Sequence, residues 1–279
     1  MNEHDDAIVA VEDRNASYLS IVVILGWFII QWQLSVLMQS FFQHRYGAHR
    51  QFTMSKRWER FFHLLAWVIQ GPSYLHPPTY AIMHRMHHAY SDTPNDPHSP
   101  FQQKNFATMM WRTRTLFDDL RYRRVAVEAR FEGGFPEWHF LDETVGGWTT
   151  PVAWGVLYTG LYIVLATHWW LFVLLPIHLV LGPTHGAIVN YFGHKVGYHN
   201  YDNDDHSRNT LIVDVLTMGE LFQNNHHKWA QSPNFAIRWF ELDLGYQFVR
   251  LLGWLRIIDL SRAQVPHWRA HAEPVSRPS

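Results

Sequence analysis

The chain of 279 residues contains no cysteine, 20 histidines and 14 tryptophans, and 47% of its residues are hydrophobic while only 17% are charged. Without cysteine, the sequence excludes a disulfide framework, a thiolate zinc site, a cysteine-ligated iron–sulfur cluster and a cysteine nucleophile. A formal net charge of −1 gives no electrostatic reason to expect nucleic acid as a partner. Any metal would therefore be bound through nitrogen and oxygen atoms.

The first long element predicted along the chain is a membrane-spanning helix. Residues 1–16 form an acidic N-terminal tail, and the segment 17–42 that follows contains no Lys, Arg, Asp or Glu. A helix of this length would reach about 39 Å, which exceeds the ~30 Å thickness of the hydrocarbon core of a bilayer. The run is longer than the apolar part of a signal peptide and lacks a basic start, so we expect an anchor that is retained.

Two further spans are predicted in a second charge-free region, which runs from residue 144 to residue 194. A short break divides this region into spans at 148–167 and 170–190. Between the first span and this region lies another apolar stretch, at 59–76, which a Gln-Gly-Pro sequence interrupts. It is short for a span and typical of a re-entrant or interfacial helix.

The distribution of basic residues predicts the orientation of these elements. Of the 23 Lys and Arg residues, one precedes the first span and none lies within a predicted span. By the positive-inside rule, the N-terminal tail is outside and the other polar segments face the cytoplasm, which requires three crossings. The sequence therefore predicts an all-α integral membrane protein with about three spanning helices, one re-entrant or interfacial helix and a cytoplasmic helical cap. A soluble protein with buried core helices is the alternative.

The domain organisation follows from these elements. Residues 17–262 are expected to form one membrane domain, in which the cytoplasmic cap contains the polar segments between and after the spans. The Pro-containing C-terminal stretch at 263–279 is expected to be a disordered tail.

Eight of the 20 histidines fall into four groups whose spacing suits metal ligation. Within HRMHH and QNNHH, three polar residues stand at i, i+3 and i+4, so they share one face of a helix. HRYGAH directly follows the first span, and NYFGH lies at the end of the last one. The eight histidines are His44, His49, His84, His87, His88, His194, His226 and His227. One ion cannot use eight imidazoles, so the sequence predicts a di-metal site of iron, zinc, copper or nickel.

The four groups must lie on the same membrane face if they share one metal centre. This condition requires that the segment 59–76 does not cross the membrane and that the region 148–190 crosses it twice. The distribution of basic residues leads to the same arrangement. We therefore expect the cytoplasmic cap to hold the di-metal site.

These motifs resemble the membrane histidine-box fatty acyl desaturases of the stearoyl-CoA desaturase type, in a compact, bacterial-like form. HRYGAHR, HRMHHAYSDTPNDPHSP, VNYFGHKVGY, DHSRN and GELFQNNHH occur in the family's order and spacing, over roughly residues 41–262. The resemblance implies two iron ions that activate O2 and remove two hydrogens from a methylene pair of a long acyl chain. It also implies that the eight histidines hold the irons and that Asn190 holds a water beside one of them.

Two features depart from the family pattern. The family typically has four spans and both termini in the cytoplasm, whereas this chain has room for one span before its first histidine group. The last group usually starts with histidine, where this chain has Gln223. Three outcomes are open for the metal: a vacant or water-filled position, ligation by Gln223, or replacement by another histidine, for which His185 on the last span is the candidate.

Asp92, Asp96 and His98 closely follow the HRMHH group, within SDTPNDPH. We interpret them as groups that accept hydrogen bonds from the ligating imidazoles and so orient them. The alternative is that they form turns before the two prolines of this segment.

The reaction that the resemblance implies needs two electrons per turnover as well as O2. The sequence has no evident flavin motif, so we expect a separate donor of the ferredoxin, rubredoxin or cytochrome b5 type at the cytoplasmic face. Five arginines form a basic patch for such a donor, for lipid headgroups or for substrate phosphates, or serve only to orient the protein. They are Arg112, Arg114, Arg121, Arg123 and Arg124. The expected substrate is a long-chain acyl thioester, on CoA or acyl carrier protein, or a membrane lipid, and the expected location is a bacterial inner membrane rather than the endoplasmic reticulum.

Other functions stay open at this point. An acyl-chain hydroxylase, acetylenase or oxidative decarboxylase would use the same di-iron centre, and the motifs hardly distinguish them. A zinc-dependent membrane hydrolase would need an H-E-x-x-H helix or an equivalent glutamate base, and no such motif occurs. A metal transporter is the non-enzyme alternative, but the spans offer only His168, His178 and His185 as ligands and no carboxylate pathway.

Overall fold

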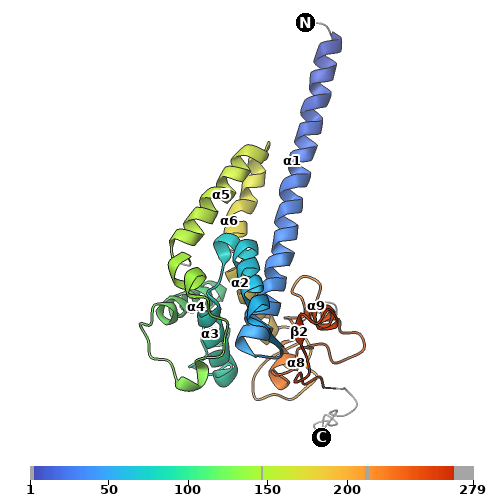
Figure 1. Cartoon of the computed structure of the whole chain (residues 1–279). Coiled ribbons are helices and arrows are strands. Elements are labelled where there is room, and N and C mark those ends of the chain that lie inside the picture. Colours follow the sequence, from blue (N-terminus) through green and yellow to red (C-terminus); the bar gives the residue numbers. More distant parts are fainter. Residues whose placement is uncertain (1–2, 146, 211–213, 267–279) are drawn as a thin grey trace.

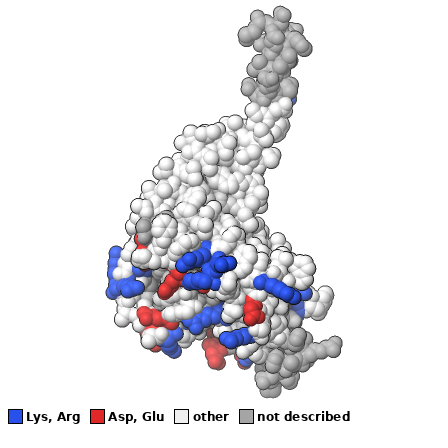
Figure 2. Space-filling model, in the orientation of Figure 1, with Lys and Arg blue, Asp and Glu red and all other residues white. Residues whose placement is uncertain are grey.

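The computed structural model describes residues 3–145, 147–210 and 214–266. Most of these residues are helical, as predicted. Figure 1 shows an elongated molecule in which α1 (Glu3–Met38) extends away from a cap, with α5 (Thr149–Leu165) and α6 (Leu174–Leu179) on the same side of the cap as α1. In Figure 2, charged side chains gather on the cap, and the part beyond it shows almost none in this view. The molecule therefore has a polar cap and an apolar region beyond it.

The described residues contain one helix, α1, that is by itself long and apolar enough to cross a bilayer. This helix begins at Glu3. Residues 3–16 of the predicted tail at 1–16 therefore form its first turns. The predicted span at 170–190 is broken, because η5 (Trp169–Val173) and α6 meet α7 (Leu181–Lys195) at a bend of 70°. If this bent pair is one span, two such helices are present, and α5 is a shorter apolar helix of 17 residues. The count of three crossings stays a prediction.

α2 (Lys56–Gln70) occupies the place of the predicted interfacial helix at 59–76. It begins after Ser55, whose side chain accepts a hydrogen bond from a backbone N–H of the first turn. It ends at Gly71, which has a φ of 52° and lies so close to α5 that a Cβ would be 2.7 Å from Tyr158 Oη. Both the dihedral angle and the close approach require glycine at this position.

The cap contains the remaining short helices and one pair of strands. They are η1 (Gln39–Ala48), which continues α1 as a π-helix, η2 (Gly71–Ser73), α3 (Pro77–Tyr90), α4 (Phe106–Arg121), η3 (Ala129–Phe131), η4 (Phe140–Val145), α8 (Gln223–Lys228), α9 (Leu244–Trp254), β1 (Thr53–Met54) and β2 (Ile258–Asp259). The strands are antiparallel, with Thr53 opposite Asp259. Local sequence determines several helix ends: α3 starts with two prolines after its N-cap His76, and Asn105 forms a capping box at the start of α4. Residues 267–279 of the tail predicted at 263–279 lie outside the described residues.

Two apolar clusters hold α1 at different points along its length. In the cap, side chains at the end of α1 and in η1 pack against α2, α9 and β2. The buried members of this cluster are Met38, Phe41, Phe42, Phe52, Phe62, Ala66, Val249, Leu252 and Ile258. Further along α1, Ile24 packs with Tyr162 of α5 and Leu171 of η5. Burial of this apolar surface fixes the first helix against both the cap and the second apolar region.

A buried arginine connects η1 to the C-terminal part of the cap. The Arg45 side chain is fully buried, and its guanidinium donates to both carboxylate oxygens of Asp243, at 2.9 and 2.8 Å, and to Glu220 at 2.9 Å. Its Nε donates to the Pro233 carbonyl at 3.0 Å, and the guanidinium lies 4.0 Å from the centre of the Phe235 ring. Asp243 also caps α9. Because a charge buried this deeply needs its partners, the network fixes η1 relative to α9 and to the segment before α8.

Replacing Arg45 with methionine would leave two buried carboxylates without their cation, and such a loss costs about 3–5 kcal/mol. We expect Arg45→Met to lower the thermal unfolding temperature of the detergent-solubilised protein strongly. Arg250→Met, at an exposed position of α9, is the control and should change it little. An Arg45→Met protein as stable as the parent would show that the network does not hold the cap together.

Candidate metal centre

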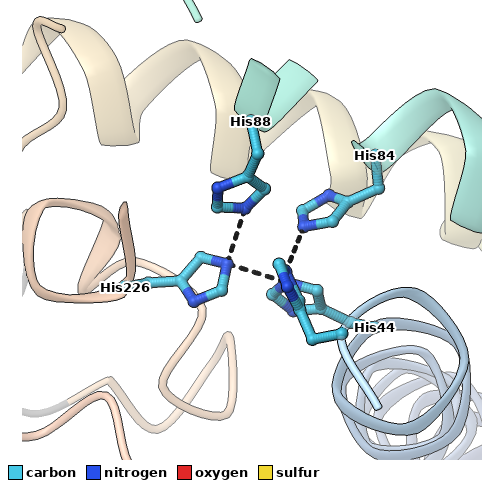
Figure 3. Close-up of side chains that lie close together, drawn as sticks. His44, His84, His88 and His226 are labelled. Carbon is cyan, nitrogen blue, oxygen red and sulfur yellow. Dashed lines mark hydrogen bonds between the residues drawn. The ribbon is translucent and has the colours of Figure 1, made fainter. Parts of the chain in front are cut away.

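Five histidines each place one ring nitrogen within 4.8 Å of the others. The five, called the five-histidine cluster below, are His44, His49, His84, His88 and His226. Figure 3 shows four of these rings turned toward a common centre from η1, α3 and α8. The Nε2 atoms of His44 and His88 both lie 3.0 Å from that of His226, and those of His49 and His84 are 2.7 Å apart. Nitrogen atoms this close converge on a space that a single cation can occupy.

The π-helical turn of η1 explains how the two histidines of HRYGAH share a face. On an α-helix, side chains five residues apart point in directions about 140° apart. In η1, the His49 backbone N–H donates to the His44 carbonyl at 3.1 Å, which is an i to i+5 hydrogen bond. The two ring centroids are consequently 4.9 Å apart.

A second group, the three-histidine cluster, consists of His87, His194 and His227, from α3, α7 and α8. All three Nε2 atoms are buried and have no hydrogen-bond partner among the described residues. An unpaired buried ring nitrogen is costly unless something else binds it. Three such atoms within 4.8 Å of one another fit a metal ion.

Each histidine of the three-histidine cluster has a carboxylate on its other ring nitrogen. The pairs are His87 with Asp96 at 3.0 Å, His194 with Asp92 at 2.9 Å, and His227 with Asp205 at 2.5 Å. A carboxylate only accepts, so the proton lies on Nδ1 and the Nε2 lone pair faces the cluster. This arrangement orients ligating imidazoles in many metal sites.

Asp92 and Asp96 are among the residues that the sequence predicts to orient imidazoles, and Asp205 is not. Its segment contains three aspartates, Asp202, Asp204 and Asp205, within four positions. Only the folded loop shows that Asp205 reaches His227, while the other two are exposed. The presence of DHSRN among the family-like motifs is the one signal that could have indicated it.

His98 contacts the three-histidine cluster without orienting it. Its ring lies against that of His87, with centroids 4.4 Å apart, and both of its ring nitrogens are buried without a partner. Its backbone N–H donates to Asp96 at 3.0 Å. Burial, and then the charge of His87, lower the pKa of His98 to about 3, so the ring is neutral. His98 therefore presents an uncharged polar edge beside the cluster.

Glu220 orients His44 in the same way that the aspartates orient the other cluster, and the sequence does not predict it. Glu220 Oε2 lies 2.5 Å from His44 Nδ1, and Glu220 Oε1 accepts from Ser40 at 2.5 Å. Burial would raise the pKa of Glu220, but His44 and Arg45 lower it to about 2. The ionised carboxylate therefore connects the five-histidine cluster to the Arg45 network.

The electrostatics of the two clusters differ. Burial, together with the mutual repulsion of the rings, places the pKa of His49, His84, His88 and His226 well below the ordinary value. Burial also lowers the pKa of His87, but Asp96 outweighs this effect and raises it overall. Four rings of the five-histidine cluster therefore offer neutral lone pairs, whereas the rings of the other cluster differ among themselves, because burial lowers the pKa of His227 to about 4 despite Asp205.

His185 does not belong to either histidine cluster. Gln223 Nε2 donates to the Glu220 carbonyl at 2.6 Å, and its Cγ packs so closely on α7 that a Cβ on Gly193 would lie 2.4 Å away. His185 is buried on α7. Asn190 donates through Nδ2 to a backbone carbonyl one turn earlier, so its oxygen is the atom that it can offer to a water. Of the three outcomes left open by the sequence, replacement by His185 has no support in this arrangement, and the other two stay open.

A cavity of about 680 Å³ reaches the five-histidine cluster. At one end its lining includes His44, His84, His98, Asn190 and Gln223. The rest of the lining comes mainly from α4, η2 and the region around the junction of α6 and α7, and much of it is apolar. This volume is within the range of sites that enclose small ligands. A long apolar ligand in the cavity would lie beside His44 and His84 of the five-histidine cluster.

Because Asp205 fixes His227, we expect Asp205→Asn to weaken binding of one of two metal ions by about 10- to 100-fold. Metal content after dialysis against graded chelator, measured by mass spectrometry, should show the loss of about half of the metal. The neighbouring Asp204→Asn is the matched control and should retain all of it. Equal retention in the two variants would contradict a role for Asp205.

Because the Gln223 amide donates to the Glu220 carbonyl, we expect Gln223→Ala to keep the metal content of the parent. His227→Ala removes one of three imidazoles and should lose the metal of that cluster. The same chelator titration measures both. Loss of metal in Gln223→Ala would show that Gln223 is a ligand.

Comparison with known proteins gives a consistent result. The chain matches the sequence model of the family described as "Fatty acid desaturase" over residues 16–253. It is 30% identical over 242 residues to a hex-5-enoyl-[acyl-carrier protein] acetylenase of Moorena producens, an alignment that covers 80% of this chain and 71% of that protein. It is 28% identical over 268 residues to an sn-1 stearoyl-lipid 9-desaturase of Anabaena variabilis, covering 89% and 86% of the two chains.

Proposed function

Because the chain belongs to the fatty acid desaturase family, we propose that it introduces a double bond into a long acyl chain, using O2 and two electrons from a separate donor. The observation that carries this proposal is the position of the five-histidine cluster beside an apolar cavity, with the three-histidine cluster next to it. The donor set consists of imidazole nitrogens, which suit iron. The cavity supplies the space in which an acyl chain can be held next to them.

In this proposal, the five-histidine cluster holds one iron and the three-histidine cluster holds the other. Asn190 holds a water beside the second iron, and His185 and Gln223 are not ligands. Two bound irons supply, with O2, the oxidising power for an alkyl C–H bond, which side-chain acids and bases cannot break.

The protein residues prepare the site in three ways. Glu220 and the three aspartates keep a proton on Nδ1 of their histidines, so each Nε2 lone pair stays directed at its cluster. The apolar lining of the cavity excludes water and aligns the acyl chain along one path. The buried Arg45 network prevents η1 and the segment before α8 from separating. A rigid arrangement of this kind limits the reaction to the methylene pair nearest the clusters.

The same proposal gives the protein an orientation in the membrane. The family and the apolar helices indicate association with a membrane. We propose that α1, α5 and the bent pair of η5–α6 with α7 cross it, with the cap and its basic residues in the cytoplasm of a bacterial cell. An electron donor of the ferredoxin, rubredoxin or cytochrome b5 type would then approach the cap from the cytoplasm.

Acetylenic bond formation is the second candidate, and the similarity to the acetylenase of Moorena producens favours it. The two activities differ in substrate, because an acetylenase acts on a chain that already has a double bond. Hydroxylation differs in that an oxygen atom from O2 is retained in the product. Product analysis therefore distinguishes the three.

We expect expression in a lipid-producing host to yield a new unsaturated fatty acid, detected by fatty acid profiling with localisation of the double bond. His226→Ala should abolish this product while the protein stays in the membrane, because it removes an imidazole of the five-histidine cluster. His139→Ala, at an exposed position, is the control and should keep it.

Other products would overturn the proposal. A triple bond in place of a double bond would assign an acetylenase. Retention of labelled oxygen in the chain would assign a hydroxylase. Zinc in place of about two irons per chain in an active preparation would exclude the oxidase chemistry altogether.

A further inference from the structure

The cavity that reaches the five-histidine cluster has an apolar rim. Three of the residues that line it are also largely exposed: Trp111 on α4 (77%), Trp148 at the start of α5 (64%) and Val180 at the junction of α6 and α7 (49%). A side chain that lines a cavity and yet is open to the outside lies at its mouth. The mouth is therefore bounded by α4, α5 and the bend between α6 and α7.

This mouth lies at the boundary between the apolar and the polar parts of the molecule. In Figure 1, α4 lies in the cap at the level where α5 begins. The segments that carry Trp148 and Val180 belong to the region from residue 144 to residue 194, which has no charged residue. Tryptophan is enriched at the level where the hydrocarbon core of a bilayer meets the headgroups. The mouth is thus placed to open sideways into a bilayer rather than into the cytoplasm.

The helix α4 has the character of a helix that lies at a membrane surface. Phe106 and Trp111 are exposed on it next to Arg114, whose side chain is 55% exposed. Large exposed aromatic residues beside arginine are typical of interfacial helices, in which the rings enter the bilayer and the cations meet anionic headgroups. A water-facing helix would gain nothing from exposing these rings.

Arg114 is the cation best placed to meet a headgroup at the mouth. Its guanidinium lies 5.6 Å from the centre of the Trp148 ring, and its Nε donates to Asp118 at 2.7 Å. Its two terminal nitrogens have no hydrogen-bond partner among the described residues, so they can bind a phosphate in a forked geometry. Arg121, which also lines the cavity, is bonded to Glu143 and to a backbone carbonyl.

We infer that the enzyme takes its acyl chain from a membrane glycerophospholipid, which enters the cavity sideways while Arg114 holds the phosphate of the headgroup. The inference rests on the proposed function and names its substrate class. A chain already in the bilayer reaches this mouth without crossing water, whereas a soluble acyl thioester would have to approach an apolar rim from the aqueous side. Arg114 then fixes how deep the chain enters, and thus which methylene pair lies beside the clusters.

The experiment separates preformed lipid from newly made thioester in intact cells, where the host supplies electrons. Saturated chains of the host phospholipids are labelled isotopically, fatty acid synthesis is then stopped with an inhibitor, and expression of the full chain is induced. We expect the labelled saturated chains to become unsaturated while they remain in phospholipid. Unsaturation that occurs only while synthesis is running would overturn the lipid inference and assign a thioester substrate. No unsaturation under either condition would overturn the proposed function itself.

A pair of variants tests the contact at the mouth. Arg114→Gln removes the proposed phosphate contact, and we expect it to slow conversion of preformed lipid at least fivefold, with unchanged iron content. Arg124→Gln is the matched control, because Arg124 is equally exposed (62%), also pairs with an aspartate and does not line the cavity. Arg124→Gln should convert lipid at the rate of the parent. Equal rates in the two variants would overturn the role of Arg114.

Discussion

The buried guanidinium of Arg45 is the contact on which the cap depends. It joins η1, the continuation of the longest apolar helix, to Asp243 at the start of α9 and to Glu220 just before α8. Glu220 in turn fixes the His44 ring of the five-histidine cluster. One ion-pair network therefore determines both how the cap is assembled and how a potential ligand is oriented. Removal of either carboxylate would leave the buried Arg45 charge with one partner fewer, and removal of Glu220 would also free the His44 ring.

The same principle recurs across the rest of the centre. Three histidines in a buried environment each have an aspartate on one ring nitrogen and an unpaired nitrogen on the other. These aspartates come from two loops far apart in sequence, so the loops are as much a part of the site as the helices that carry the histidines. The protein thus has its donor atoms directed inward by its own hydrogen bonds, which is the condition for binding a metal without a large rearrangement.

The position of this centre relative to the apolar part of the molecule explains how the proposed chemistry reaches its substrate. The clusters lie in the cap, and the cavity leads from the five-histidine cluster to the level at which α5 begins. Trp111 and Trp148 lie at its mouth, and the Arg114 guanidinium lies 5.6 Å from the centre of the Trp148 ring. From one end of an amphipathic lipid to the other come an apolar chain, a carbonyl region and a phosphate. This order matches the order of the apolar cavity, the tryptophans at its mouth and Arg114. The match between the two supports chain transfer from the bilayer.

The sequence by itself determined the type of protein and singled out the eight histidines of the two clusters, because uncharged segments and i, i+3, i+4 spacings are local patterns with direct physical meaning. It predicted the helical class, a membrane anchor and four histidine groups that would meet. It could not divide these groups between two clusters. On α3, His84 and His88 point about 40° apart, whereas His87 points about 60° to the other side of His84. Only the packing of η1, α7 and α8 decided which ring met which partner. The π-turn that aligns His49 with His44, and the choice of Asp205 among three aspartates, likewise depend on contacts between segments far apart in sequence. The position of Gln223 was decided in the same way, because its hydrogen bond and its packing on α7 exist only in the folded cap.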